Sequence, residues 1–170
     1  MNDANCFALS EAIDGSGANY KSVWGVIIGS GFGGSFVYEK KVIEGVNQIA
    51  GDWGHQPLPY PTEEEINSNV QCNVGNCKRP LCAEQFISGI GFTKLFNEKY
   101  GTSLRTREIV ALEANGDERA KKEFELYEDR FARLISVMIG IVDPEVIVFG
   151  GGMSICLLYT SPSPRDLAQS

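Results

Sequence analysis

The stretch VIIGSGFGGS at residues 26–35 constrains the fold more than any other part of the chain. Its glycines at 29, 31 and 34 have the G-x-G-x-x-G spacing of a dinucleotide-binding loop, after which a helix must face the pyrophosphate. Residues 36–43, FVYEKKVI, are instead rich in aromatic and β-branched side chains around a charged break at 39–41, which predicts strand, turn and strand. The sequence therefore predicts a hairpin bent at the glycine loop. It disfavours a flavin or nicotinamide oxidoreductase, which we keep as an alternative.

The remaining apolar patterns predict an α/β fold, and 170 residues suffice for one domain with its own core. A long amphipathic helix is expected over 117–142, where apolar residues recur at helical spacing. Residues 62–70 are acidic and polar and predict a surface excursion. The other predicted elements are a helix at 4–13, a strand at 22–28, broken helices at 86–100, a helix at 105–114 and a strand at 146–149.

Composition argues against several classes of function. The net charge of −7 and the lack of a Lys/Arg cluster disfavour nucleic acid as a partner. No apolar run approaches the roughly 20 residues of a membrane span, and the N-terminus lacks a signal-peptide pattern. We therefore expect a cytoplasmic protein with no membrane partner. ATP stays possible, because backbone N–H groups and a divalent cation can hold it in an acidic protein.

Three of the five cysteines, Cys72, Cys77 and Cys82, lie within one short segment, and His55 is the single histidine. In a reducing compartment such a cluster is more often a metal site than a disulfide framework. A Cys3His set suits tetrahedral zinc, and four protein ligands leave no position for water, so the zinc would be structural. Free thiols are the alternative, because the spacing is wider than that of a zinc ribbon.

Carboxylates stand next to these features. Asp3 lies at a predicted helix start, where it is either a cap or a base that accepts a proton from a substrate hydroxyl. Glu84 follows Cys82 by two residues, and Asp52 precedes His55. A zinc that ties His55 to Cys82 would fix Asp52 and Glu84 beside each other.

Two glycine loops each follow an apolar strand, at 29–34 and at 150–152. Such loops bring backbone N–H groups against phosphate or let an adenosine pack on bare backbone.

Together, and in this order, these motifs resemble the C-terminal domain of the ROK (repressor, open reading frame, kinase) sugar kinases. The matching stretches are NDAN at 2–5, VIIGSGFGGS at 26–35, AGDWGHQPLP at 50–59, CAEQFISGIGF at 82–92 and VDPEVIVFGGGMS at 142–154. The resemblance implies an incomplete actin-like, ribonuclease-H-like kinase domain (C-terminal lobe) at 1–153, with a zinc-binding segment at 55–84. Residues 154–170 are expected to be an irregular tail that is foreign to the domain.

The resemblance also implies a role for individual residues. Asp3 would be the catalytic base, and His55 would touch both the sugar and the Zn²⁺. Further sugar ligands would be Asn2, Asp3, Asp52 and Glu84; zinc ligands His55, Cys72, Cys77 and Cys82; ATP ligands Gly29, Ser30, Gly31, Gly33, Gly150, Gly151 and Gly152. The implied reaction is Mg²⁺-ATP-dependent phosphorylation of a hexose.

Within the family, the sequence of residues 53–59 and 86–92 is most similar to the fructokinase/mannokinase branch, and fructose is the expected hexose. N-acetylglucosamine or glucose kinase and a sugar-responsive transcriptional regulator are the alternatives. The resemblance implies a homodimeric parent, and the chain by itself is expected to be inactive, because the family's D-x-G-G-T-K phosphate motif is absent. The chain departs from the family pattern C-x-C-G-x-x-G-C-x-E in its first gap, which is four residues long, and in its glycines, which are replaced within 78–81. In a separate departure, Asp52 stands where the family usually has Glu.

Overall fold

The computed structural model describes residues 2–154 and contains a mixed four-stranded sheet of order β3-β2-β1-β4. β1 (Ser22–Ile28) pairs antiparallel with β2 (Phe32–Tyr38) and parallel with β4 (Val146–Gly150), and the short β3 (Lys41–Val42) extends the β2 edge. The strand β2 follows the glycine turn at 29–31 directly, as predicted. No helix therefore starts at this loop, and the dinucleotide-binding alternative lacks the element it requires.

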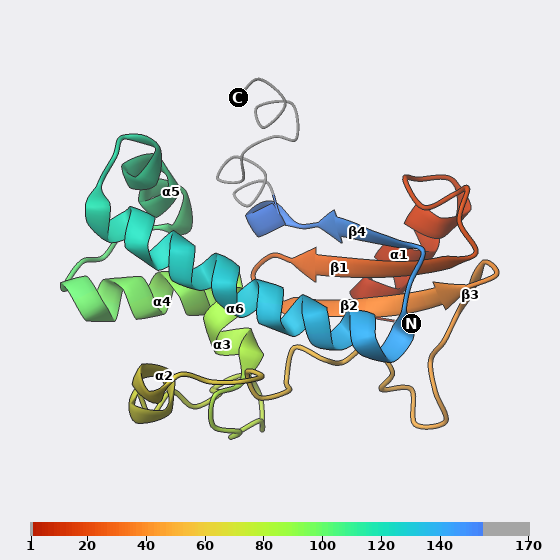
Figure 1. Ribbon diagram of the computed structural model, residues 1–170, viewed down its shortest axis with the longest axis horizontal. Coiled ribbons are helices and arrows are strands. Elements are labelled where there is room, and N and C mark those ends of the chain that lie inside the picture. Colours follow the sequence, from red (N-terminus) through yellow and green to blue (C-terminus); the bar gives the residue numbers. More distant parts are fainter. Residues whose placement is uncertain (1, 155–170) are drawn as a thin grey trace.

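Alternate residues of β1 face two different helical layers, which makes the fold a three-layer α/β structure. Val23 belongs to a cluster with Ala8 and Ala12 of α1 (Asp3–Ile13), whereas Trp24 and Val26 belong to the larger core. Figure 1 shows α6 in front of the sheet and α1 behind it.

Apart from α2, the helices agree closely with the sequence predictions. The helices after α1 are α2 (Glu63–Asn67), α3 (Ala83–Ile87), α4 (Gly89–Tyr100), α5 (Thr106–Ala114) and α6 (Glu118–Val142). The predicted break in 86–100 occurs at Ser88, whose hydroxyl caps α4 by accepting from the Gly91 N–H at 3.0 Å. The excursion at 62–70 contains a helix that we did not predict, α2, which begins with a capping box. No helix within 2–154 is long and apolar enough to cross a membrane.

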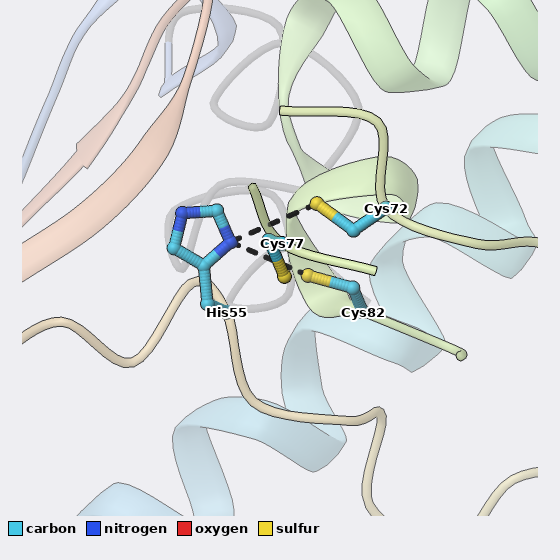
Figure 2. Close-up of side chains that lie close together, drawn as sticks. All are labelled: His55, Cys72, Cys77 and Cys82. Carbon is cyan, nitrogen blue, oxygen red and sulfur yellow. Dashed lines mark hydrogen bonds between the residues drawn. The ribbon is translucent and has the colours of Figure 1, made fainter. Parts of the chain in front are cut away.

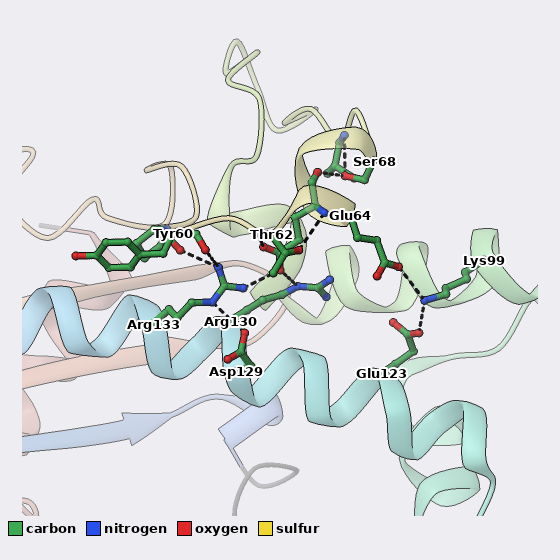
Figure 3. Close-up of polar contacts among 12 residues, drawn as sticks. Tyr60, Thr62, Glu64, Ser68, Lys99, Glu123, Asp129, Arg130 and Arg133 are labelled. Atoms are coloured by element: carbon green, nitrogen blue, oxygen red, sulfur yellow. Dashed lines mark hydrogen bonds and ion pairs between the residues drawn. The ribbon is translucent and has the colours of Figure 1, made fainter.

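A buried ion network fastens the excursion to α6 (Figure 3). Glu65 is 3% exposed, and its Oε1 accepts from Arg130 Nε at 2.8 Å and from Arg133 Nη2 at 2.7 Å. Arg133 Nη1 also donates to the carbonyl oxygens of Pro59 and Tyr60, at 2.8 Å each. The chain on both sides of this network, 50–58 and 70–84, carries the predicted sugar and metal residues, so the network fixes where that segment lies.

We expect Glu65→Gln to lower the free energy of unfolding by roughly 3 kcal/mol at neutral pH, because it leaves the largely buried Arg130 guanidinium without its counter-charge and Arg133 with only the exposed Asp129. Asp129→Asn is the matched control: Asp129 also binds Arg133, at 2.9 Å, but its side chain is 60% exposed, so a cost below about 1 kcal/mol is expected. Urea unfolding measures both. Equal effects of the two substitutions would contradict this assignment.

The same network predicts a pH dependence of stability. Burial raises the pKa of Glu65, but hydrogen bonds from Arg133 and Arg130 outweigh burial, and the pKa lies below its ordinary 4.5. A carboxyl group with a lowered folded-state pKa stabilises the fold above its unfolded-state pKa and loses that contribution as the pH falls through the folded-state pKa. The difference in stability between the wild type and Glu65→Gln should therefore shrink as the pH drops below 4.5.

Candidate functional site

Two glycines let residues 51–55 lie directly on β2. A Cβ atom on Gly54 would lie 2.0 Å from the carbonyl oxygen of Phe32, and one on Gly51 (φ 91°) would lie 2.4 Å from that of Gly34. Between them, Trp53 is buried with its ring centroid 4.8 Å from that of Phe32. Because a larger residue at either glycine would push the segment off the strand, these two positions set the place of Asp52 and His55.

Backbone hydrogen bonds then join this segment to the start of α3. The N–H of Ala83 donates to the Gln56 carbonyl at 2.8 Å, and the N–H of Glu84 donates to the Gly54 carbonyl at 2.7 Å. His55 therefore lies beside Cys82 and Glu84, although they are far apart in sequence.

The structure gathers His55, Cys72, Cys77 and Cys82 into one cluster, the Cys3His tetrad (Figure 2). His55 Nδ1 lies 3.5 Å from Cys82 Sγ and 3.8 Å from Cys72 Sγ, and the four ligand atoms lie within 4.8 Å of one another. Ligand atoms of a tetrahedral zinc, at 2.0–2.3 Å from the ion, are roughly 3.5–3.8 Å apart. The residues present therefore fit a structural zinc ion held through Nδ1 of His55.

The long gap after Cys72 is absorbed by an irregular hairpin. The Cys72 N–H donates to the Arg79 carbonyl at 3.1 Å, and the Leu81 N–H donates to the Val70 carbonyl at 2.9 Å. The turn between these arms includes Gly75, at φ 52°. Leu81 adopts φ 53°, a left-handed conformation that favours glycine, and the ROK pattern has glycine at this position. The departure in spacing thus does not remove Cys72 from the tetrad.

The thiols have unlike surroundings. Burial raises the pKa of Cys82 to about 12, and the nearby Cys72 thiol adds to the rise. The pKa of Cys77 is lowered, chiefly because the backbone N–H of Arg79 faces its sulfur. The guanidinium of Arg79 donates to the His55 carbonyl at 3.0 Å, and Gln85 Nε2 lies 3.9 Å from Cys72 Sγ.

Glu84 lies between the tetrad and the glycine turn. The residue is 6% exposed; Oε2 accepts from the Phe32 N–H at 2.8 Å, and Oε1 would lie 3.2 Å from a Cβ atom on Gly31. Burial raises the pKa of Glu84; the Phe32 hydrogen bond and the charge of His55 oppose the rise, whereas Asp52 adds to it. Asp52, His55 and Glu84, predicted as sugar ligands, therefore form one electrostatic group.

Both glycine loops contribute to one cavity of about 440 Å³. Its lining residues are Gly29, Ser30, Gly89, Ile90, Thr106, Arg107, Val110, Gly152 and Met153. The Gly89 N–H donates to the Gly29 carbonyl at 2.8 Å, which ties the start of α4 to the turn. Apolar side chains beside hydroxyl groups and bare backbone suit a nucleoside, so the cavity is a candidate nucleotide site.

Of the residues predicted to bind ATP, Gly29, Ser30 and Gly152 line this cavity, and the other four do not. Gly33 lies within β2 and Gly150 within β4, where its backbone meets the Phe7 ring. Gly151 (φ 89°) lies against the Ile28 carbonyl oxygen. Sequence analysis did not predict that α4 and α5 line this cavity. The motif SGIGF at 88–92 was the one local signal for these walls.

Asn2 and Asp3 begin α1. Asn2 Oδ1 accepts from the Asn5 N–H at 2.8 Å, so Asn2, not Asp3, is the N-cap of this helix. Asp3 is exposed, and among residues 2–154 the structure shows no hydrogen bond or ion pair of its carboxylate. Asp52 and His55 line a second cavity, of about 640 Å³, without Asp3. The structure thus brings Asp52, His55 and Glu84 together but gives no contact between them and Asp3. The predicted tail lies outside the described residues, except for Ser154.

Comparison with known proteins gives one family. The model of the ROK family matches residues 1–161. An N-acetyl-D-glucosamine kinase of Photobacterium profundum is 36% identical over 168 residues, which are 99% of this chain and 55% of that protein. The chain thus spans about half the length of this curated relative.

Solved structures show the same fold. A ROK hexokinase from Thermus thermophilus superposes with a TM-score of 0.81 at 23% identity, over 99% of this chain and 54% of that one. A ROK family glucokinase from Streptomyces griseus in complex with glucose and AMPPNP gives a TM-score of 0.77 at 21% identity, over 99% and 57%. The motifs, the fold and the family match agree, and the chain belongs to the ROK family.

Proposed function

We propose that the protein to which these residues belong transfers the terminal phosphate of Mg²⁺-ATP to a hydroxyl group of a hexose. The observation that carries this proposal is the cavity in which Gly29 and Ser30 of one glycine loop meet Gly152 of the other. Phosphoryl transfer depends mainly on positioning and charge stabilisation, which backbone loops and a divalent ion supply.

The proposed acceptor is N-acetylglucosamine, with glucose as second choice. The expectation of fructose rested on the short sequence stretches 53–59 and 86–92. It gains no support from the relatives, because the 36% identical protein of Photobacterium profundum is an N-acetyl-D-glucosamine kinase.

In this proposal the sugar lies against Asp52, His55 and Glu84, and the nucleotide lies beyond the glycine turn. Glu84 Oε2 is held by the Phe32 N–H, which leaves Oε1 to accept from a sugar hydroxyl. His55 turns Nδ1 toward the thiols and so presents Nε2 to the sugar. Asp3 accepts the proton of the attacking hydroxyl. Zinc, when bound by the tetrad, orders the segment that carries these groups.

The zinc proposal predicts one equivalent of metal in the purified chain and a lower melting temperature after treatment with a chelator. Cys82→Ser should lose the metal, because it removes a buried ligand. Cys6→Ser, at an exposed cysteine outside the tetrad, should keep it. Metal analysis of the three proteins checks this; a wild type without zinc would refute it.

The nucleotide proposal predicts that AMPPNP binds in the 440 Å³ cavity. A Cβ atom on Gly29 meets no described atom within 4 Å, so Gly29→Leu should fold normally and yet weaken binding at least tenfold by filling the site. Gly140→Leu, at an equally open exposed position on α6, should leave binding unchanged. Calorimetric titration distinguishes the two variants, and equal affinities would place the nucleotide elsewhere.

Catalysis is testable in a fusion that places this chain after the N-terminal half of the Photobacterium relative, because the chain alone is expected to be inactive. ADP release should be faster with N-acetylglucosamine than with glucose, and slowest with fructose. Asp3→Asn should reduce kcat by at least about 100-fold, because the general base is lost, while Asp14→Asn at the other end of α1 should not. An active Asp3→Asn fusion would exclude Asp3 as the base.

A further inference from the structure

Arg79 contacts three of the four members of the Cys3His tetrad. Its guanidinium donates to the His55 carbonyl at 3.0 Å, its own carbonyl accepts from the Cys72 N–H at 3.1 Å, and its backbone N–H faces the Cys77 sulfur. Within residues 2–154, it is the basic residue whose side chain hydrogen-bonds to a tetrad member. Arg79 therefore links the ligand-bearing hairpin to His55 itself, in addition to the backbone hydrogen bond from Leu58 to Leu81 that joins the two segments nearby.

The guanidinium of Arg79 also lies near the negative charge that the tetrad would carry with a metal bound. Three thiolates and a neutral imidazole around a divalent ion leave one net negative charge. The neighbouring titratable groups, Asp52 and Glu84, add further negative charge rather than offsetting it. A guanidinium fixed at the edge of the cluster lowers the electrostatic cost of holding three thiolates together.

We propose that Arg79 is a positioning residue for the metal: its guanidinium holds the His55 backbone in place for coordination and compensates the charge of the three thiolates. The proposal rests on the proposed zinc site. It assigns a function to a residue of the segment 78–81, which replaces the glycine-bounded spacer of the ROK pattern.

Lys78 provides a matched comparison. It is exposed, adjacent in sequence and lines the same 640 Å³ cavity as Arg79, but the structure shows no hydrogen bond or ion pair of its ammonium group with the tetrad. General attraction of a cation to this region would make the two residues equivalent, whereas positioning through the His55 carbonyl would not.

The test is a titration of the whole metal-free chain with Co²⁺, followed by competition with Zn²⁺, in wild type, Arg79→Met, Arg79→Lys and Lys78→Met. The visible absorption of tetrahedral Co²⁺ with thiolate ligands reports coordination directly. Arg79→Met should bind 10–100-fold more weakly, the range typical of lost outer-shell partners. Arg79→Lys should recover part of the loss, because it keeps the charge, and Lys78→Met should stay within about twofold of wild type.

Urea unfolding of the metal-free proteins separates positioning from general stability. Equal unfolding midpoints of metal-free Arg79→Met and wild type, together with weaker metal binding by the variant, support the proposal. Equal metal affinities of Arg79→Met and Lys78→Met would overturn it and leave the zinc site intact. A wild type that takes up neither Co²⁺ nor Zn²⁺ would overturn the zinc site and the role of Arg79 together.

Discussion

The carboxylate of Glu84, buried and hydrogen-bonded to the first N–H of β2, joins the two halves of the candidate site. On one side it fixes the start of β2, directly after the glycine turn at 29–31. On the other side, the backbone N–H of Glu84 donates to the carbonyl of Gly54, one residue before His55. A buried charge is costly unless it is hydrogen-bonded, so this geometry makes the glycine turn, the His55 segment and α3 mutually dependent.

Glycines occur at the positions where two segments approach so closely that a Cβ atom would clash. Gly54 and Gly51 let one segment lie on β2, and Gly25 lets α1 approach the other face, where an added Cβ atom would lie 2.5 Å from the Cβ atom of Ala8. The sheet is thus covered at van der Waals distance on both faces. Residues 50–84 have little regular secondary structure, and contacts with β2, α3 and α6 hold them in place.

Sequence reasoning was most successful where the signal was local. The aromatic and β-branched residues after Gly31 predicted β2, and helical spacing predicted α6. The place of Cys72 in the tetrad could not be derived from its spacing alone, because it depends on hydrogen bonds between the two arms of the 70–82 hairpin. The same holds for the walls of the nucleotide cavity: Thr106 and Arg107 belong to a separate helix, and nothing in their own sequence indicates that α5 lies beside the glycine turn.

The hairpin that carries Cys72 and Cys77 shows how a departure from a family pattern can be accommodated. A glycine-bounded spacer can turn tightly without side-chain help, whereas Leu81 here takes a left-handed conformation at a cost of order 1 kcal/mol. Three features offset that cost: the Leu81 side chain packs against the main core, its N–H binds the Val70 carbonyl, and its carbonyl accepts from the Leu58 N–H at 2.8 Å. The strain at Leu81 is therefore held by hydrogen bonds next to those of Ala83 and Glu84, which bring Cys82 beside His55. Because these are backbone hydrogen bonds, they do not require glycine at 78 or 81, and the tetrad forms here with the longer first gap and without those glycines.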